Sequence, residues 1–223
     1  MASNQQLSQN GPRMRWPKPV LLVLILAVAL PELVLTLADN ELIGSTRWRS
    51  ISYQNGAFWT GILRDWQVNF AAQPTVMFAT YSFLHTDMLH MLGNIVALFW
   101  LGRIAIARIG SWRFLGLYLL SALGGAAVFG LLSQGFRPMV GASGAIFGLA
   151  GGWLVWELRT ARTEARNWRQ PAIQTAKQVG FLVGLNFVVL WLQNGELAWQ
   201  THLGGFLTGA IIAALLPSTR SDF

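Results

Sequence analysis

The run VGASGAIFG at residues 140–148 places one serine, Ser143, among small residues where a loop becomes an apolar helix. Gly141 and Gly144 let the backbone turn sharply and approach closely on either side of the hydroxyl group. An exposed nucleophile with a backbone N–H beside it needs such a turn. From Gly144 onward, glycines four residues apart also make the small-xxx-small steps by which membrane helices bring their backbones together. The stretch alone therefore fits either a nucleophile or helix packing.

The composition is that of a membrane protein. Of the 223 residues, 53% are hydrophobic and 11% are charged, whereas a soluble globular protein carries about 25% charged residues. The chain has no cysteine, which excludes disulfides, catalytic thiolates and cysteine-based metal sites. A net charge of +7 would suggest nucleic acid as the partner of a soluble protein. Here the charges are distributed as membrane orientation requires, so no nucleic-acid partner is expected.

The apolar segments predict six membrane spans. The first covers residues 19–38, because about twenty apolar residues cross a bilayer, whereas the core of a signal peptide has about 7–15. Residues 39–72 mix aromatic and charged side chains, which suits a first outer loop in the headgroup region or an ordinary surface loop. The five further spans are predicted at 88–107, 111–132, 143–158, 178–193 and 200–217. The predicted fold class is an all-α polytopic membrane protein with a six-helix bundle.

The positive charges orient these spans. With a cytoplasmic N-terminus, twelve of the 16 Lys and Arg residues lie on the cytoplasmic side and four on the other. This asymmetry follows the positive-inside rule, so both termini are predicted to be cytoplasmic. The predicted organisation is a cytoplasmic tail at 1–18, a membrane domain at 19–217 and a cytoplasmic tail at 218–223. The expected location is the inner (plasma) membrane of a bacterial-type cell.

This topology gathers reactive side chains near the outer, periplasmic face. Ser143 starts the fourth span and His202 the sixth, and both spans run inward from the outside, so the two side chains lie at one depth. The second span also begins outside and carries His85, His90 and Asn94 near its start. His90 and Asn94 are four residues apart, share one helix face and can both donate hydrogen bonds. A histidine here can be merely buried and hydrogen-bonded, but ionisable groups within membranes are functional candidates because they are costly to bury.

Three histidines also invite comparison with a zinc site. His85 and His90 are five residues apart, which places them about 140° apart around a continuous helix. They therefore differ from the i, i+4 pair of a zinc protease, and zinc sites usually need three protein ligands in one place. Neither a metal nor another cofactor is expected.

Taken together, these features resemble the rhomboid family of intramembrane serine proteases, of the bacterial six-helix type, over about residues 74–215. The resemblance is specific because the order, spacing and depth of the motifs agree. The motifs are Gly141-Ala142-Ser143-Gly144 at the head of the fourth span, His202 followed by Gly205 and Gly209 in the sixth, and His85, His90 and Asn94 around the second.

The resemblance implies that Ser143 is the nucleophile and His202 its general base, a dyad without the carboxylate of a triad. It also implies an oxyanion site made by the Ser143 backbone N–H with the side chains of His90 and Asn94. Phe147, one turn below Ser143, would support the imidazole of His202, with lipid or core packing as the alternative.

The resemblance assigns structural roles as well. The Gly205–Gly209 step would let the sixth helix press on the glycine-rich fourth, bringing His202 to Ser143. The fifth span and the loop at 194–200 would act as gate and cap of the site.

The first outer loop departs from the family pattern. Many relatives carry Trp-Arg shortly before the histidine motif, where this chain has Val76-Met77. The pair Trp48-Arg49 lies too far upstream to be equated with it. Tyr81 stands where many relatives have another histidine. Glu32, an acidic residue in the first span, has no role that the sequence assigns.

The predicted function is hydrolysis of peptide bonds in or near transmembrane segments of membrane proteins. A substrate helix must unwind locally to offer its scissile carbonyl, so weak helix formers are expected near the cut. The expected partners are transmembrane protein substrates and membrane lipid, and the oligomeric state is left open. The main alternative is an inactive rhomboid-like binding or escort factor, which the retention of Ser143 and His202 disfavours. A small transporter is a third reading, although transporters often have related halves and this chain shows no repeat.

Overall fold

The computed structural model describes residues 18–164 and 198–217, together with residues 169, 170, 173, 177 and 180. Within these residues helices are the only extended regular elements, and one isolated antiparallel bridge joins Phe58 to Met139. With η denoting a 3-10 helix, the elements are α1 (Pro19–Asp39), α2 (Trp48–Gly56), η1 (Thr60–Arg64), α3 (Gln73–Thr80), η2 (Tyr81–Phe83), α4 (Met88–Ile109), α5 (Ser111–Leu132), α6 (Ser143–Glu164) and α8 (Trp199–Leu215).

Four predicted spans agree with observed helices to within two residues at either end, namely α1, α4, α5 and α8. The helix α6 continues beyond the predicted end at residue 158, because the Leu, Arg and Ala residues that follow Glu157 are good helix formers. Among the described residues, α1, α4 and α5 are long and apolar enough to cross a membrane. The predicted span at 178–193 lies almost wholly outside the described residues, so the total of six spans and the orientation of the termini stay predictions.

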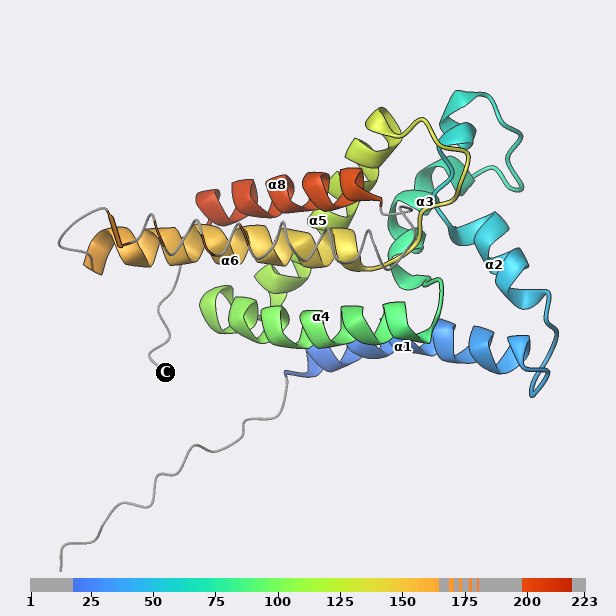
Figure 1. Ribbon diagram of the computed structural model, residues 1–223, viewed down its shortest axis with the longest axis horizontal. Coiled ribbons are helices and arrows are strands. Elements are labelled where there is room, and N and C mark those ends of the chain that lie inside the picture. Colours follow the sequence, from blue (N-terminus) through green and yellow to red (C-terminus); the bar gives the residue numbers. More distant parts are fainter. Residues whose placement is uncertain are drawn as a thin grey trace, which may run out of the picture.

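Helices α6 and α8 lie side by side along the long axis of the molecule (Figure 1). A Cβ atom on Gly205 would overlap the carbonyl oxygen of Gly144, and a Cβ atom on Gly209 would overlap that of Gly148. The two backbones therefore touch where the sequence predicts small-residue packing, and any larger residue at either position of α8 would push the helices apart.

The larger core cluster joins α1, α4, α5 and α6. Its largest fully buried members are Leu21, Leu98, Phe114, Leu117, Tyr118, Leu149 and Trp156. Gly102 of α4 allows close packing on α1, since a Cβ atom there would lie 2.7 Å from Cδ1 of Leu21. This cluster fixes α4 between α1 and α6, and so sets the position of every side chain that α4 carries.

The segment at 39–72, predicted as the first outer loop, contains two short helical elements, α2 and η1, and its place outside the membrane stays a prediction. The segment that forms α2 has no continuous apolar stripe, and none of its residues is buried. The residues that follow α2 hold the strand-like segment before α6. Phe58 and Met139 exchange backbone hydrogen bonds of 3.0 and 2.9 Å, Thr60 Oγ1 donates to the Gly135 carbonyl, and Arg64 donates to the Ser133 carbonyl.

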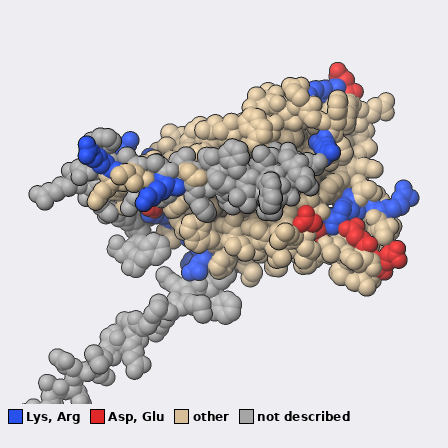
Figure 2. All heavy atoms as spheres, in the orientation of Figure 1, with Lys and Arg blue, Asp and Glu red and all other residues tan. Residues whose placement is uncertain are grey.

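The charged side chains lie mainly at the two ends of the molecule. On the face shown in Figure 2, Lys and Arg gather at one end of the long axis, charges of both signs gather at the other, and the visible surface between them is almost uncharged. Helices α1, α4 and α8 expose large apolar side chains, among them Val23, Val96 and Ile211. Such a surface is stable in contact with lipid and not with water.

Candidate active site

Ser143 is the first residue of α6 and lies at the end of the bundle where α4 and α8 also begin (Figure 1). Gly141 has a φ of +124°, which L-residues with a side chain rarely adopt. Its N–H donates to the carbonyl oxygen of Tyr81 (3.0 Å), which ties the turn to η2. A Cβ atom on Gly141 would lie 3.0 Å from Nε2 of His90, so glycine is required here by both conformation and space.

His202 of α8 faces Ser143. Its Nε2 atom lies 2.8 Å from Oγ of Ser143, within hydrogen-bonding distance. His202 is 6% exposed, and Ser143 is partly exposed. The contact depends on the close approach of α6 and α8, since Gly205 lies one turn below His202 and touches Gly144.

Phe147 contacts His202 from the same helix as Ser143. Its ring stacks on the imidazole with the centroids 4.2 Å apart and the planes inclined by 12°. The stacking holds the plane of the imidazole ring with Nε2 toward Ser143. The sequence left two environments open for Phe147, contact with His202 or packing against lipid or the core, and the structure places its ring against His202.

His90 and Asn94 of α4 lie beside the turn at Gly141. Nε2 of His90 and Nδ2 of Asn94 are 3.0 and 3.8 Å from the position that a Cβ atom on Gly141 would occupy. The Nδ2 atom of Asn94 is buried and has no hydrogen-bond partner in the part of the chain that the structure describes. A buried donor without a partner is costly, and an acceptor brought by a ligand would satisfy it.

The residues before α4 orient His90. Oδ1 of Asp87 accepts a hydrogen bond from the backbone N–H of His90 (2.9 Å), which caps the helix. Oγ1 of Thr86 lies 3.1 Å from Nδ1 of His90. Burial favours a higher pKa for Asp87, but hydrogen bonds from His90 and Thr86 outweigh it and lower the pKa below the ordinary value. Asp87 is therefore ionised at the positive end of the α4 dipole.

His85 is fully buried beside the segment that leads to Ser143. Its Nε2 atom lies 3.5 Å from the backbone N of Ala142, a long hydrogen bond in which the ring accepts. Burial, with a smaller contribution from nearby His90, lowers the pKa of His85 from 6.5 to about 3. The ring is therefore neutral at physiological pH, with its proton on Nδ1.

The histidine rings of His85 and His90 meet edge to face with centroids 5.1 Å apart. Within the described residues, no group of three or more His, Cys, Asp or Glu side chains is placed to hold a metal ion.

Tyr81, at the position where the family pattern has histidine, is fully buried, and its hydroxyl donates to the Ala122 carbonyl at 2.8 Å. Burial raises the pKa of Tyr81 to about 12.

Glu32 and Arg49 form an ion pair that sequence reasoning did not predict. Nη2 and Nη1 of Arg49 donate to Oε1 and Oε2 of Glu32 at 2.8 and 2.9 Å. An acidic residue within an apolar span is costly to bury and signals the presence of a partner. The sequence could not identify that partner, because Arg49 lies 17 positions from Glu32 in a short, mostly polar segment, and local patterns do not report such distant contacts. The predicted gate at 178–193 lies outside the described residues apart from residue 180, and of the predicted cap at 194–200 the structure describes residues 198–200, where α8 begins.

The apolar helices and the nearly uncharged belt between two charged ends define a helical membrane protein. The family model of the rhomboid domain matches residues 73–219. The chain belongs to the rhomboid family, as its motifs predicted, and this family includes serine intramembrane proteases.

Three relatives illustrate the similarity. The chain is 37% identical to RHOMBOID-like protein 5 of Arabidopsis thaliana over 137 residues, which cover 60% of this chain and 41% of that protein. It is 32% identical to rhomboid protease GluP of Bacillus subtilis over 60% of this chain and 24% of that protein. With rhomboid protease AarA of Providencia stuartii the identity is 26%, over 58% of this chain and 52% of that protein. The chain thus spans about half the length of these relatives or less.

Proposed function

We propose that this protein is an intramembrane serine endopeptidase in which Ser143 is the nucleophile and His202 the general base. The observation that carries the proposal is the 2.8 Å contact between Nε2 of His202 and Oγ of Ser143, made across two helices at one end of the bundle. A serine hydroxyl is a weak nucleophile until an adjacent base takes its proton, and this contact supplies that base.

The reaction follows from the contact. His202 Nε2 takes the hydroxyl proton while Oγ of Ser143 bonds to the scissile carbonyl carbon, and a tetrahedral intermediate forms. The imidazolium then gives this proton to the leaving amine as the peptide C–N bond breaks, which leaves an acyl group on Ser143. Water, deprotonated by His202, attacks the ester, and the proton returns to Ser143 when the acid product leaves.

The negative charge of the tetrahedral intermediate is stabilised by donors beside Ser143. In this proposal they are the backbone N–H of Ser143, Nδ2 of Asn94 and Nε2–H of His90. The buried Nδ2 of Asn94, for which the described part of the chain offers no acceptor, supports the assignment, because an oxyanion would satisfy it. His90 can donate from Nε2 when the Thr86 hydroxyl, whose one proton otherwise goes to Oδ2 of Asp87 (2.8 Å), turns to donate to Nδ1 of His90 at 3.1 Å. Phe147 keeps the plane of His202 constant during both proton transfers.

The substrates are transmembrane proteins cleaved close to the outer face of the inner (plasma) membrane. The site residues lie at the end of the bundle opposite to Arg108 and Arg159, which bind Glu157 and the last carbonyls of α8. By the positive-inside rule that basic end is cytoplasmic, so the site opens toward the outer, periplasmic side. A substrate helix must unwind to reach Ser143, which favours glycine, proline or other weak helix formers near the cut.

The experiment is cleavage of a single-span model substrate by the purified protein in liposomes, with Ser143→Ala and His202→Ala as variants and with or without a chelator. We expect both variants to lose cleavage activity and the chelator to leave the activity of the parent protein unchanged. Cleavage that survives Ser143→Ala would sink the proposal. Absence of cleavage by the parent protein with several substrates, together with substrate binding, would favour the escort function.

A further inference from the structure

The proposed oxyanion side of the site depends on a short segment, His85–His90, that precedes and begins α4. His85 accepts a hydrogen bond from the N–H of Ala142, next to Ser143. Thr86 and Asp87 bind the side chain and the backbone of His90. Movement of this segment would therefore displace both the donor on His90 and the turn that carries Ser143.

The segment is held from outside the site by Arg49 and Tyr53 of α2. Nη1 of Arg49 donates to the carbonyl oxygens of His85 and Thr86 at 3.0 and 3.3 Å. The hydroxyl of Tyr53 donates to the same His85 carbonyl at 2.6 Å. Two side chains of one helix thus fix the backbone of the residue whose ring contacts Ala142.

Arg49 is itself fixed by Glu32 of α1. Glu32 is fully buried, accepts both guanidinium hydrogen bonds described above and accepts a third from Oγ1 of Thr36 at 3.0 Å. The planar fork of arginine matches a carboxylate in this bidentate arrangement, which lysine cannot reproduce. The hydrogen bonds to Glu32, and one to Asp39, raise the pKa of Arg49 above its ordinary value, so its charge is permanent.

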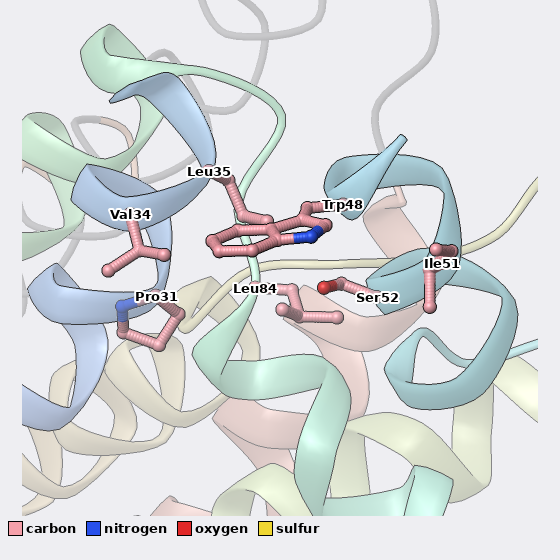
Figure 3. Close-up of a pocket in the computed structure, with 7 residues that line it drawn as sticks. All are labelled: Pro31, Val34, Leu35, Trp48, Ile51, Ser52 and Leu84. Carbon is pink, nitrogen blue, oxygen red and sulfur yellow. The ribbon is translucent and has the colours of Figure 1, made fainter. Parts of the chain in front are cut away.

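Apolar packing between α1 and α2 is incomplete, which increases the importance of these polar contacts. Figure 3 shows an open pocket between the two helices, lined by side chains of α1, of α2 and of the residue before His85. The lining residues are Pro31, Val34, Leu35, Trp48, Ile51, Ser52 and Leu84. No residue of α2 is buried. Asn69, Gln73 and Thr80 hold the C-terminal half of α2 by hydrogen bonds to its carbonyl oxygens, and Arg49 and Tyr53 supply its polar contacts with the segment before α4.

We propose that Glu32, Arg49 and Tyr53 form an anchor that positions the His85–His90 segment and so sets the geometry of the oxyanion side of the site. The three are positioning residues, and none touches the reacting atoms. The expected fall in kcat rests on the proposed function, whereas the positioning of the His85–His90 segment by the anchor does not. A small displacement of catalytic donors lowers the rate of the chemical step more than it lowers substrate binding.

The kinetic test compares Tyr53→Phe, Glu32→Gln and Arg49→Lys with the parent protein in the liposome assay. We expect kcat to fall about threefold for Tyr53→Phe and about tenfold for the other two, with KM within twofold. The matched control is Glu157→Gln, which removes the ion pair of 3.1 Å with Arg108 at the other end of α4 and leaves kcat unchanged.

The structural test is amide hydrogen exchange of peptides covering residues 84–92 in the same proteins. Faster exchange in the three anchor variants, and unchanged exchange in Glu157→Gln, is expected. If the three anchor variants show unchanged exchange and a kcat within twofold of the parent value, the anchor is overturned. This holds even if Ser143→Ala abolishes cleavage and so supports the proposed function. If the parent does not cleave, exchange alone decides: faster exchange supports the anchor while the proposed function fails, and unchanged exchange overturns the anchor as well.

Discussion

Gly205 of α8 lies against the carbonyl oxygen of Gly144 in α6 so closely that no Cβ atom fits between them. Gly144 directly follows Ser143, and Gly205 lies three residues after His202, so this contact sets how near the histidine comes to the serine. The 2.8 Å distance between Nε2 and Oγ is thus a consequence of helix packing as much as of the two side chains. Both interpretations of the glycine-rich run, packing and chemistry, apply to the same residues.

Gly205→Val is expected to lower the rate of cleavage about a hundredfold or more. The added side chain separates α8 from α6 and so breaks the contact of His202 with Ser143. Overpacking of this kind also lowers stability by about 1–3 kcal/mol. Initial rates of model-substrate cleavage and thermal unfolding in detergent measure the two effects. Gly116→Ala in α5 is the control, since a Cβ atom there meets nothing within 4 Å. Full activity in Gly205→Val would show that the dyad does not depend on this contact.

Ser143 and His202 are expected to act as a unit. Ser143→Ala and His202→Ala should each lower kcat about 10⁴-fold or more, and the double variant should lose no more than either single variant. The reason is that the base has no proton to take once the hydroxyl is gone. Single-turnover cleavage measures the rates. A double variant whose loss equals the product of the two single losses would contradict the dyad.

The sequence predicts the bundle well and the region before α4 poorly. The predicted segment 111–132 matches α5 at both ends, because long apolar runs specify helices in a membrane without help from the rest of the chain. The segment WRSISYQNG of α2 has no such run. Its helix is held by contacts with Glu32 and His85, which lie 17 and 36 positions from Arg49, and local patterns do not report such distant contacts.

The candidate site divides in the same way. Ser143 and His202 could be predicted because both start spans that enter from one side, so topology alone places them at one depth. Two features could not: the Nδ2 atom of Asn94, which has no partner among the described residues, and the long hydrogen bond from Ala142 to His85. Both depend on side-chain positions set by the packing of α4 on α6. Glu32 signalled a need for a partner but not its identity.

Asn94→Ala is expected to lower kcat about 10²–10³-fold with KM within threefold, because the amide is required only when negative charge develops on the substrate oxygen. Steady-state kinetics separate the two constants. Gly93→Ala is the matched control on the preceding residue, where a Cβ atom has open space. A rise in KM at constant kcat would instead assign Asn94 to substrate binding.

His85 should make the stability of the protein depend on pH between about 4.5 and 6.5. Its folded-state pKa of about 3 lies below the ordinary value of 6.5, so in this window the unfolded chain binds a proton at His85 that the folded chain does not. The stability that His85 contributes is complete above pH 6.5 and is lost as pH falls, by up to about 1.4 kcal/mol per pH unit. Thermal unfolding in detergent across this window measures the slope.

The variant that tests this dependence is His85→Gln, whose amide oxygen can replace Nε2 as acceptor for the N–H of Ala142 but carries no titrating group. We expect its unfolding temperature to stay close to that of the parent at pH 7.5 and to fall less steeply toward pH 4.5. Asp87, whose pKa is lowered, stays ionised in both proteins over this range. Identical slopes for the two proteins would mean that His85 is protonated in the folded state, and the neutral acceptor role beside Ala142 would then be wrong.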